Sequence, residues 1–185
     1  ARYLIVELIT AISFLLIFLS FKNLYTIIFL SILILILIMI FFIDLENFII
    51  PDSLNFSIMG LAFIKNFLPS FNTSLIHDIN QSLIGGIIGY FSIWLIIFLY
   101  KTLKKIDGMG LGDAKLMAGI GLLFGWQSIP LVLFLSSILG LFFVAPSLLK
   151  KQKTMKSEIP FGPFIIIAML IYFVFGDFFY GLILV

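Results

Sequence analysis

The chain has 185 residues, of which 63% are hydrophobic and 11% are charged. A soluble domain carries roughly twice that charged fraction, so the composition indicates a membrane protein with several spans. The net charge of +2 is too small to suggest a nucleic-acid partner. The sequence has no cysteine and a single histidine, His77, which excludes disulfides, thiolate metal sites, a cysteine nucleophile and a multi-histidine metal site.

Apolar stretches close to the roughly 20 residues that a helix needs to cross a bilayer recur along the chain. Because these runs are long, and lipid admits only helices and closed barrels, we expect an all-α bundle of about seven transmembrane helices. The expected helices, in a single domain (1–185), are 3–20, 24–43, 53–69, 82–100, 112–126, 128–149 and 161–182. The fifth is short and glycine-rich, which makes it the weakest candidate for a full span. The first 20 residues do not resemble a signal peptide, because Glu7 comes early and no clear small-residue cleavage site follows.

Lysine and arginine residues are distributed unevenly between the two sides of this expected bundle. If residue 1 is inside, most of them also fall inside: Arg2, Lys101, Lys104, Lys105, Lys115, Lys150, Lys151, Lys153 and Lys156. Only Lys22 and Lys65 fall outside. This bias favours seven spans with the N-terminus in the cytoplasm.

Acidic residues gather at the inner face of the expected bundle: Asp44, Glu46, Asp52, Asp107 and Asp113. Asp44 follows the second apolar run and Asp113 opens the fifth, so both lie at helix ends on one side of the membrane. A carboxylate at membrane depth is energetically costly and is usually retained for function. Two carboxyl groups in one low-dielectric site share a proton, as in aspartic proteases, where one group activates water and the other polarises the scissile carbonyl.

The glycines before Asp113 admit more than one interpretation. Gly108, Gly110 and Gly112 would allow positive φ angles and the close approach of a substrate backbone. Alternatively, Asp113 is simply a helix cap, a role that aspartate commonly takes. On spacing alone the two interpretations are balanced.

Two other function classes stay open. A transporter could bind a cation or relay protons through Asp44 and Asp113. It would be expected to have carboxylates nearer mid-membrane and broken helices in two repeated halves, and neither feature is evident in the sequence. A non-catalytic membrane scaffold is the other class, with the cluster of Gly85, Gly86 and Gly89 packing helices together.

Three motifs resemble those of the type IV prepilin peptidases, which are membrane aspartic proteases of the GxGD type. The run GMGLGDAKLMAGIG (108–121) is similar to the second aspartate motif, through Gly110, Gly112, Asp113, Lys115 and Leu116. The first motif, D-x(6)-P-D-x-L, is matched by Asp44, Pro51, Asp52 and Leu54. IPFGPF (159–164) resembles the P-F-G-P run before the last helix of the family. FIDLENFIIPD and IPFGPF separate the chain from presenilin-like and signal-peptide peptidases.

The resemblance implies that Asp44 and Asp113 are the catalytic pair and that neither a metal nor a cofactor is needed. It implies hydrolysis of a type IV prepilin or pseudopilin after its short basic leader, at the cytoplasmic face of the bacterial inner membrane. The residues expected to contact the substrate are Glu46, Gly110, Gly112, Lys115, Pro160, Phe161, Gly162 and Pro163. Asp52 is expected to cap the helix after Pro51. Typical members also carry a cytoplasmic domain with paired CxxC zinc motifs that is associated with N-methylation, and this cysteine-free sequence lacks those motifs.

Overall fold

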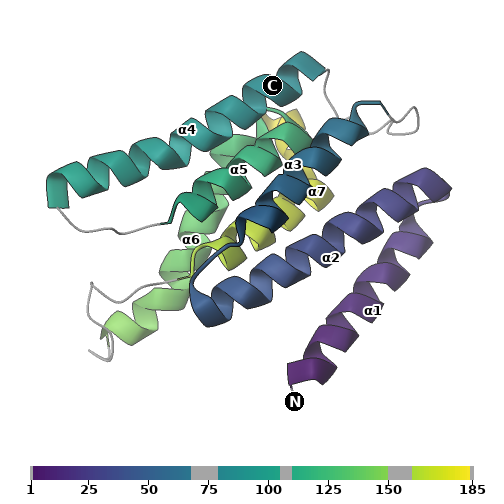
Figure 1. Cartoon of the computed structure of the whole chain (residues 1–185), viewed down its shortest axis with the longest axis horizontal. Coiled ribbons are helices and arrows are strands. Elements are labelled where there is room, and N and C mark those ends of the chain that lie inside the picture. Colours follow the sequence, from purple (N-terminus) through teal and green to yellow (C-terminus); the bar gives the residue numbers. More distant parts are fainter. Residues whose placement is uncertain (1, 68–78, 105–109, 150–159, 184–185) are drawn as a thin grey trace.

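The computed structural model describes residues 2–67, 79–104, 110–149 and 160–183. These residues form seven helices and no strand (Figure 1): α1 (Arg2–Ser20), α2 (Leu24–Asn47), α3 (Asp52–Lys65), α4 (Ile79–Lys104), α5 (Leu111–Phe124), α6 (Ser128–Leu149) and α7 (Gly162–Ile183). Each helix corresponds to one of the predicted apolar segments. The prediction of an all-α bundle is therefore confirmed.

The helices differ in whether they are long enough to cross a membrane. In the described part of the chain, α1, α2, α4 and α6 are long and apolar enough to do so. The described part of α7 has a shorter apolar stretch, Gly162–Gly176, and α3 and α5 have 14 residues each. At about 1.5 Å per residue, such a helix is about 21 Å long, against about 30 Å for the hydrocarbon core. Length and composition therefore support four spans and leave the predicted seven unconfirmed.

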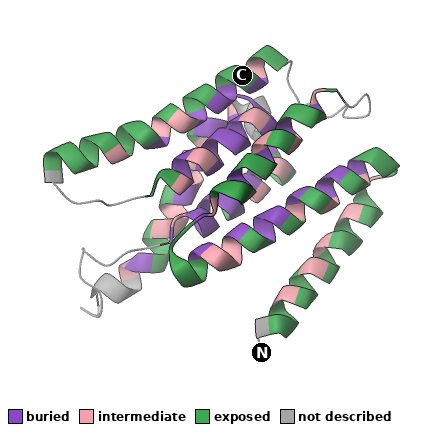
Figure 2. Cartoon of the chain, in the orientation of Figure 1, coloured by how far each residue is buried: buried purple, intermediate pink, exposed green. Residues whose placement is uncertain are grey.

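The short helix α5 lies in the interior of the bundle. It packs along α4 on one side and against α3, α6 and α7 on others (Figure 1). Ten of its 14 residues are buried, from Asp113 near its start to Phe124 at its end. In contrast, α1 contacts only α2 among the described helices, and exposed residues cover most of it (Figure 2).

Glycines allow α4 and α5 to approach closely. Gly85 of α4 and Gly121 of α5 face each other so tightly that a Cβ on either would overlap the backbone of the other. A Cβ on Gly89 would lie 2.5 Å from the carbonyl oxygen of Met117. Since no side chain fits at these positions, the prediction that the α4 glycines mediate helix packing is confirmed.

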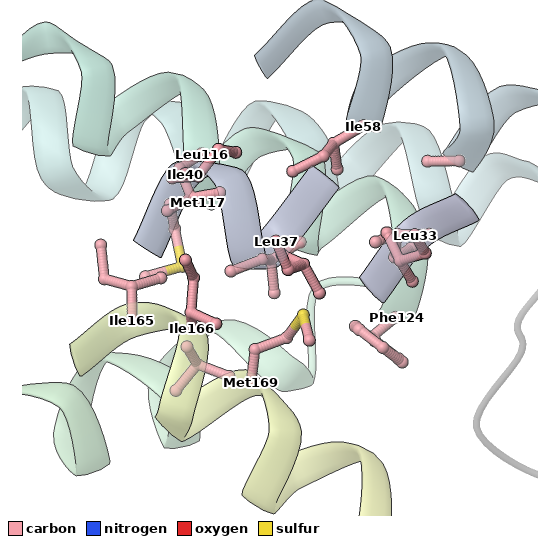
Figure 3. Packing of buried hydrophobic residues seen from close by; sticks show 14 of the residues in the cluster. Leu33, Leu37, Ile40, Ile58, Leu116, Met117, Phe124, Ile165, Ile166 and Met169 are labelled. Atoms are coloured by element: carbon pink, nitrogen blue, oxygen red, sulfur yellow. The ribbon is translucent and has the colours of Figure 1, made fainter. Parts of the chain in front are cut away.

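A layer of apolar side chains lies one helical turn from the candidate active site. Ile40 of α2, Met117 of α5 and Ile165 of α7 are fully buried in one cluster (Figure 3). These residues come four positions before Asp44, four after Asp113 and three after Gly162. Their packing holds the C-terminal end of α2 next to the N-terminal ends of α5 and α7.

Candidate active site

Asp44 lies in the last turn of α2, and its side chain is buried, with 4% of its surface exposed. The helix ends there because Phe48 adopts the left-handed conformation, with φ 56° and ψ 30°. The backbone N–H of Phe48 then donates to the carbonyl oxygen of Asp44, at 2.9 Å, which is a common way to end a helix. The chain turns back at this point towards Pro51 and α3.

The N-terminus of α7 contacts the Asp44 carboxylate directly. The backbone N–H of Gly162, the first residue of α7, donates to Oδ2 of Asp44 at 3.0 Å. The first N–H groups of a helix have no partner within the helix and carry partial positive charge, so they favour an anion. A Cβ at Gly162 would lie 2.7 Å from the same Oδ2 atom, so any larger residue would displace the carboxylate.

Asp113 lies in the first turn of α5, with 7% of its side chain exposed. The N-cap residue of α5 is Gly110, so the interpretation of Asp113 as the cap residue itself is wrong. Gly110 nevertheless makes a backbone hydrogen bond to the Asp113 carboxylate. The prediction of positive φ angles is also wrong for two of the three glycines before Asp113. Gly110 has a φ of −83° and Gly112 is helical. Gly108 lies outside the described residues.

The two carboxyl groups influence each other electrostatically. Burial, and after it the negative charge of Asp44, raise the pKa of the Asp113 carboxyl to about 7. Ile50 lies between the helix starts that carry this site: a Cβ at Gly112 or at Gly162 would lie 3.0 Å from an Ile50 side-chain atom. The site is therefore built where the end of α2 and the starts of α5 and α7 meet.

The start of α3 is tied to α5 by charged and polar side chains. Lys115 forms an ion pair with Asp52, with 2.6 Å between Nζ and Oδ1, and its Nζ lies 5.9 Å from the centre of the Phe56 ring. The N-cap residue of α3 is Pro51 and no side chain caps the helix, so the prediction that Asp52 is a cap is wrong. Asp52 instead provides a partner for Lys115.

Two buried polar residues were not predicted from the sequence. Asn55 is fully buried and donates from Nδ2 to the carbonyl oxygen of Gly112 at 3.3 Å. At the other end of α3, Lys65 is 3% exposed and donates from Nζ to the carbonyl oxygen of Leu123 at 2.5 Å. No signal in the sequence pointed to Asn55. Lys65 was assigned only to the external side of the membrane, from its place at the end of an apolar run.

The remaining predicted substrate contacts lie around this site with different exposure. Glu46, in the last turn of α2, and Gly110 are exposed. Pro160, Gly162 and Pro163 are buried and Phe161 is partly buried, at the start of α7. Asp107 lies outside the described residues. Among those described, no group of three or more acidic, histidine or cysteine side chains could hold a metal ion.

Both aspartates lie at helix ends, not at helix centres. Asp44 is in the last turn of a 24-residue helix and Asp113 in the first turn of α5. A transporter that binds ions at the bilayer midplane would carry its acidic residues nearer the middle of its spans. The position of both aspartates at helix ends fits a reaction near the membrane surface better than the transport of an ion across the membrane.

The sequence is similar to that of one family of known proteins. The sequence model of the Type IV leader peptidase family matches residues 31–145. The chain belongs to this family. The resemblance to prepilin peptidases seen in the aspartate motifs is thereby confirmed.

Relatives with similar sequence are prepilin leader peptidase/N-methyltransferases. That of Aeromonas hydrophila is 33% identical over 177 residues, which are 96% of this chain and 59% of that protein. That of Dichelobacter nodosus is 34% identical over 95% of this chain and 58% of the relative. That of Pseudomonas aeruginosa is 34% identical over 73% of this chain and 45% of the relative. The chain thus spans less than two thirds of these proteins, and no solved structure matches it.

Proposed function

We propose that this protein is a membrane aspartic endopeptidase that removes the short basic leader from type IV prepilins or related pseudopilins. Membership of the Type IV leader peptidase family supports the reaction class. The observation that carries the choice of residues is the burial of Asp44 and Asp113 at two helix ends, within electrostatic reach of each other. Of the acidic residues in the motifs that resemble those of the family, Asp44 and Asp113 are the two that are buried at this site.

In the proposed mechanism the pair holds one proton, because two neighbouring buried carboxylates do not ionise together at low cost. Asp113 carries that proton, which its pKa of about 7 supports, and Asp44 is ionised beside the Gly162 N–H. Asp44 takes a proton from water while the water oxygen adds to the scissile carbonyl, whose oxygen accepts a hydrogen bond from Asp113. Collapse of the tetrahedral intermediate then breaks the C–N bond, and the leaving nitrogen receives a proton from the pair.

The proposed site faces the cytoplasm, at the boundary of the bacterial inner membrane. In the expected arrangement of spans, Asp44 and Asp113 lie on the same side of the membrane as most of the Lys and Arg residues. An excess of these residues is typical of the cytoplasmic side, which supports this orientation. The basic leader would lie in water while the apolar pilin helix stays in lipid beside the enzyme. Glu46 is exposed one half turn beyond Asp44 and has the charge to attract a basic leader side chain.

The other proposed substrate contacts surround the dyad. The exposed Gly110 has no side chain to block an extended peptide, which would approach next to Gly112 and Lys115. The start of α7, with Pro160, Phe161, Gly162 and Pro163, would form a wall of the site next to Asp44.

Separate replacement of each aspartate tests the proposal. Asp44→Asn and Asp113→Asn should each abolish cleavage of a prepilin substrate by the purified protein, while thermal unfolding shows that both variants fold. Glu7→Gln is the matched control, because Glu7 is exposed on α1, and it should cleave at the parental rate. Normal cleavage by either aspartate variant would rule out the pair.

A further inference from the structure

Asn55 makes a contact that stability alone does not explain. The side chain is fully buried, and its Oδ1 has no hydrogen-bond partner among the described residues. Leaving a buried polar atom unpaired costs free energy that an apolar side chain of similar size would avoid. The other half of the amide makes one specific bond, from Nδ2 to the carbonyl oxygen of Gly112.

The bonded carbonyl belongs to the peptide group that joins Gly112 to Asp113. Asn55 therefore holds the backbone immediately before a candidate catalytic residue. The same turn of α5 is fixed on its outer side by the Lys115–Asp52 ion pair, whose side chains are 26% and 58% exposed. An ion pair with that exposure contributes little by itself, so the buried amide is the stronger link between α3 and this turn.

We infer that Asn55 is a positioning residue: its amide ties the first turn of α5 to α3 and so sets the distance between the Asp113 and Asp44 carboxyl groups. The inference rests on the proposed function of this pair. Asp44 is held independently, by the N–H of Gly162 on α7. Loss of the Asn55 bond would therefore move one member of the pair and leave the other in place.

A change in that distance has a recognisable consequence for catalysis. Two carboxyl groups that interact strongly lose their protons in two separate steps, and the singly protonated pair exists between them. A larger distance weakens the interaction and brings the two steps closer together, which narrows the pH range of activity. Among the described residues, the charged groups that interact with this turn are Asp44 and the paired Asp52 and Lys115, and none of them is altered in the variants below.

The test compares Asn55→Leu with Asn66→Leu in the full chain, purified and assayed on a prepilin substrate. Asn66 is the control, because it is the C-cap residue at the other end of α3 and its amide bonds groups away from the aspartates: Nδ2 donates to the Ala62 carbonyl oxygen at 3.2 Å, and Oδ1 accepts from Ser82 at 3.4 Å. Asn55→Leu should lower kcat about 10- to 100-fold with little change in KM, because small displacements of catalytic groups have effects of that size. It should also narrow the pH range of activity, whereas Asn66→Leu should keep the parental kcat and pH range.

Asn55→Ser provides a second variant, whose smaller side chain is easily accommodated and whose hydroxyl is too short to reach the Gly112 carbonyl. It should show the same narrowed pH range. Parental kcat and pH range in both Asn55 variants would overturn the inference. So would a lower rate with an unchanged pH range, or failure of both variants to fold, since each outcome assigns Asn55 a purely structural role.

The outcomes also separate this inference from the proposed function. Cleavage by Asp44→Asn or Asp113→Asn would reject the catalytic pair itself. If both of those variants are inactive and Asn55→Leu behaves like the parent, only the positioning role of Asn55 fails.

Discussion

The backbone N–H of Gly162 donates a 3.0 Å hydrogen bond to Oδ2 of Asp44, although the two residues are 118 positions apart in the sequence. This bond joins the end of α2 to the start of α7. Its donor is a backbone group, so an alanine at position 162 would keep the donor. Such a substitution would instead displace the Asp44 carboxylate, by adding atoms at Gly162.

Gly162→Ala should therefore inactivate the protein without preventing folding. The added Cβ would lie 2.7 Å from Oδ2 and 3.3 Å from Cγ of Asp44, and the carboxylate would have to move. We expect the rate of prepilin cleavage to fall about 100-fold, the size of effect that a displacement of roughly 1 Å can produce. Cleavage kinetics of the purified variant, with thermal unfolding measured in parallel, check this.

Gly60→Ala is the control for this prediction. Gly60 lies on α3, and a Cβ there would have no neighbour within 4 Å. It should cleave at the parental rate. Parental activity in Gly162→Ala would mean that the contact between α7 and Asp44 has no part in the reaction.

A second prediction concerns the close contact between α4 and α5. In Gly85→Ala the added Cβ would lie 2.6 Å from the carbonyl carbon of Gly125 and 2.7 Å from the backbone nitrogen of Trp126. Because these are backbone atoms, the helices must separate, and overpacking of this kind lowers the free energy of unfolding by about 1–3 kcal/mol. Thermal unfolding in detergent should show a lower midpoint for Gly85→Ala.

The control is again Gly60→Ala, which should unfold at or slightly above the parental midpoint, since alanine favours a helix over glycine. Equal midpoints for Gly85→Ala and the parent would show that the two helices can separate at no cost.

Lys65 gives a prediction for the pH dependence of stability. Burial lowers its pKa from 10.5 to about 8 in the folded protein. Between these values the unfolded chain binds the additional proton, so this residue makes the folded state more stable as the pH rises from about 8 to 10.5. Lys65→Met should remove that increase.

The measurement is thermal unfolding of the parent and Lys65→Met across this alkaline range. Lys22→Met is the control, because Lys22 is exposed, and it should follow the parental dependence. An identical rise in stability in the parent and in Lys65→Met would contradict a buried, weakly basic amine at this position.

Much of the fold was predictable because membrane helices are specified locally. Each predicted apolar run corresponds to a helix, and the polar residues between the runs mark the connections in the sequence. Asp44 and Asp113 were predictable because a carboxylate beside an apolar run is rare and both occur in family-like motifs. The fifth segment was expected to be the least certain span, and α5 has 14 residues, but α3 has the same length and was expected to span.

The contacts that arrange the site were not predictable, since they join residues far apart in the sequence. The pairing of Lys115 with Asp52 crosses 63 positions and the bond from Asn55 to Gly112 crosses 57. Asp52 after Pro51 fits the local sequence pattern of a helix start. Only the position of α5 shows that the Asp52 carboxylate pairs with the Lys115 side chain. Likewise, Gly112 was expected to leave room for a substrate, whereas Ile50 of the same chain lies against it.

The enclosed position of α5 has a consequence for assembly. A 14-residue helix is marginal in isolation and is shorter than the bilayer core, so α5 depends on α3 and α4 to become a helix in its final place. Asp113 is thus carried by an element whose helix depends on its neighbours. An incompletely assembled chain would hold its two acids apart, and under the proposed function it would not cleave a substrate until the bundle has closed.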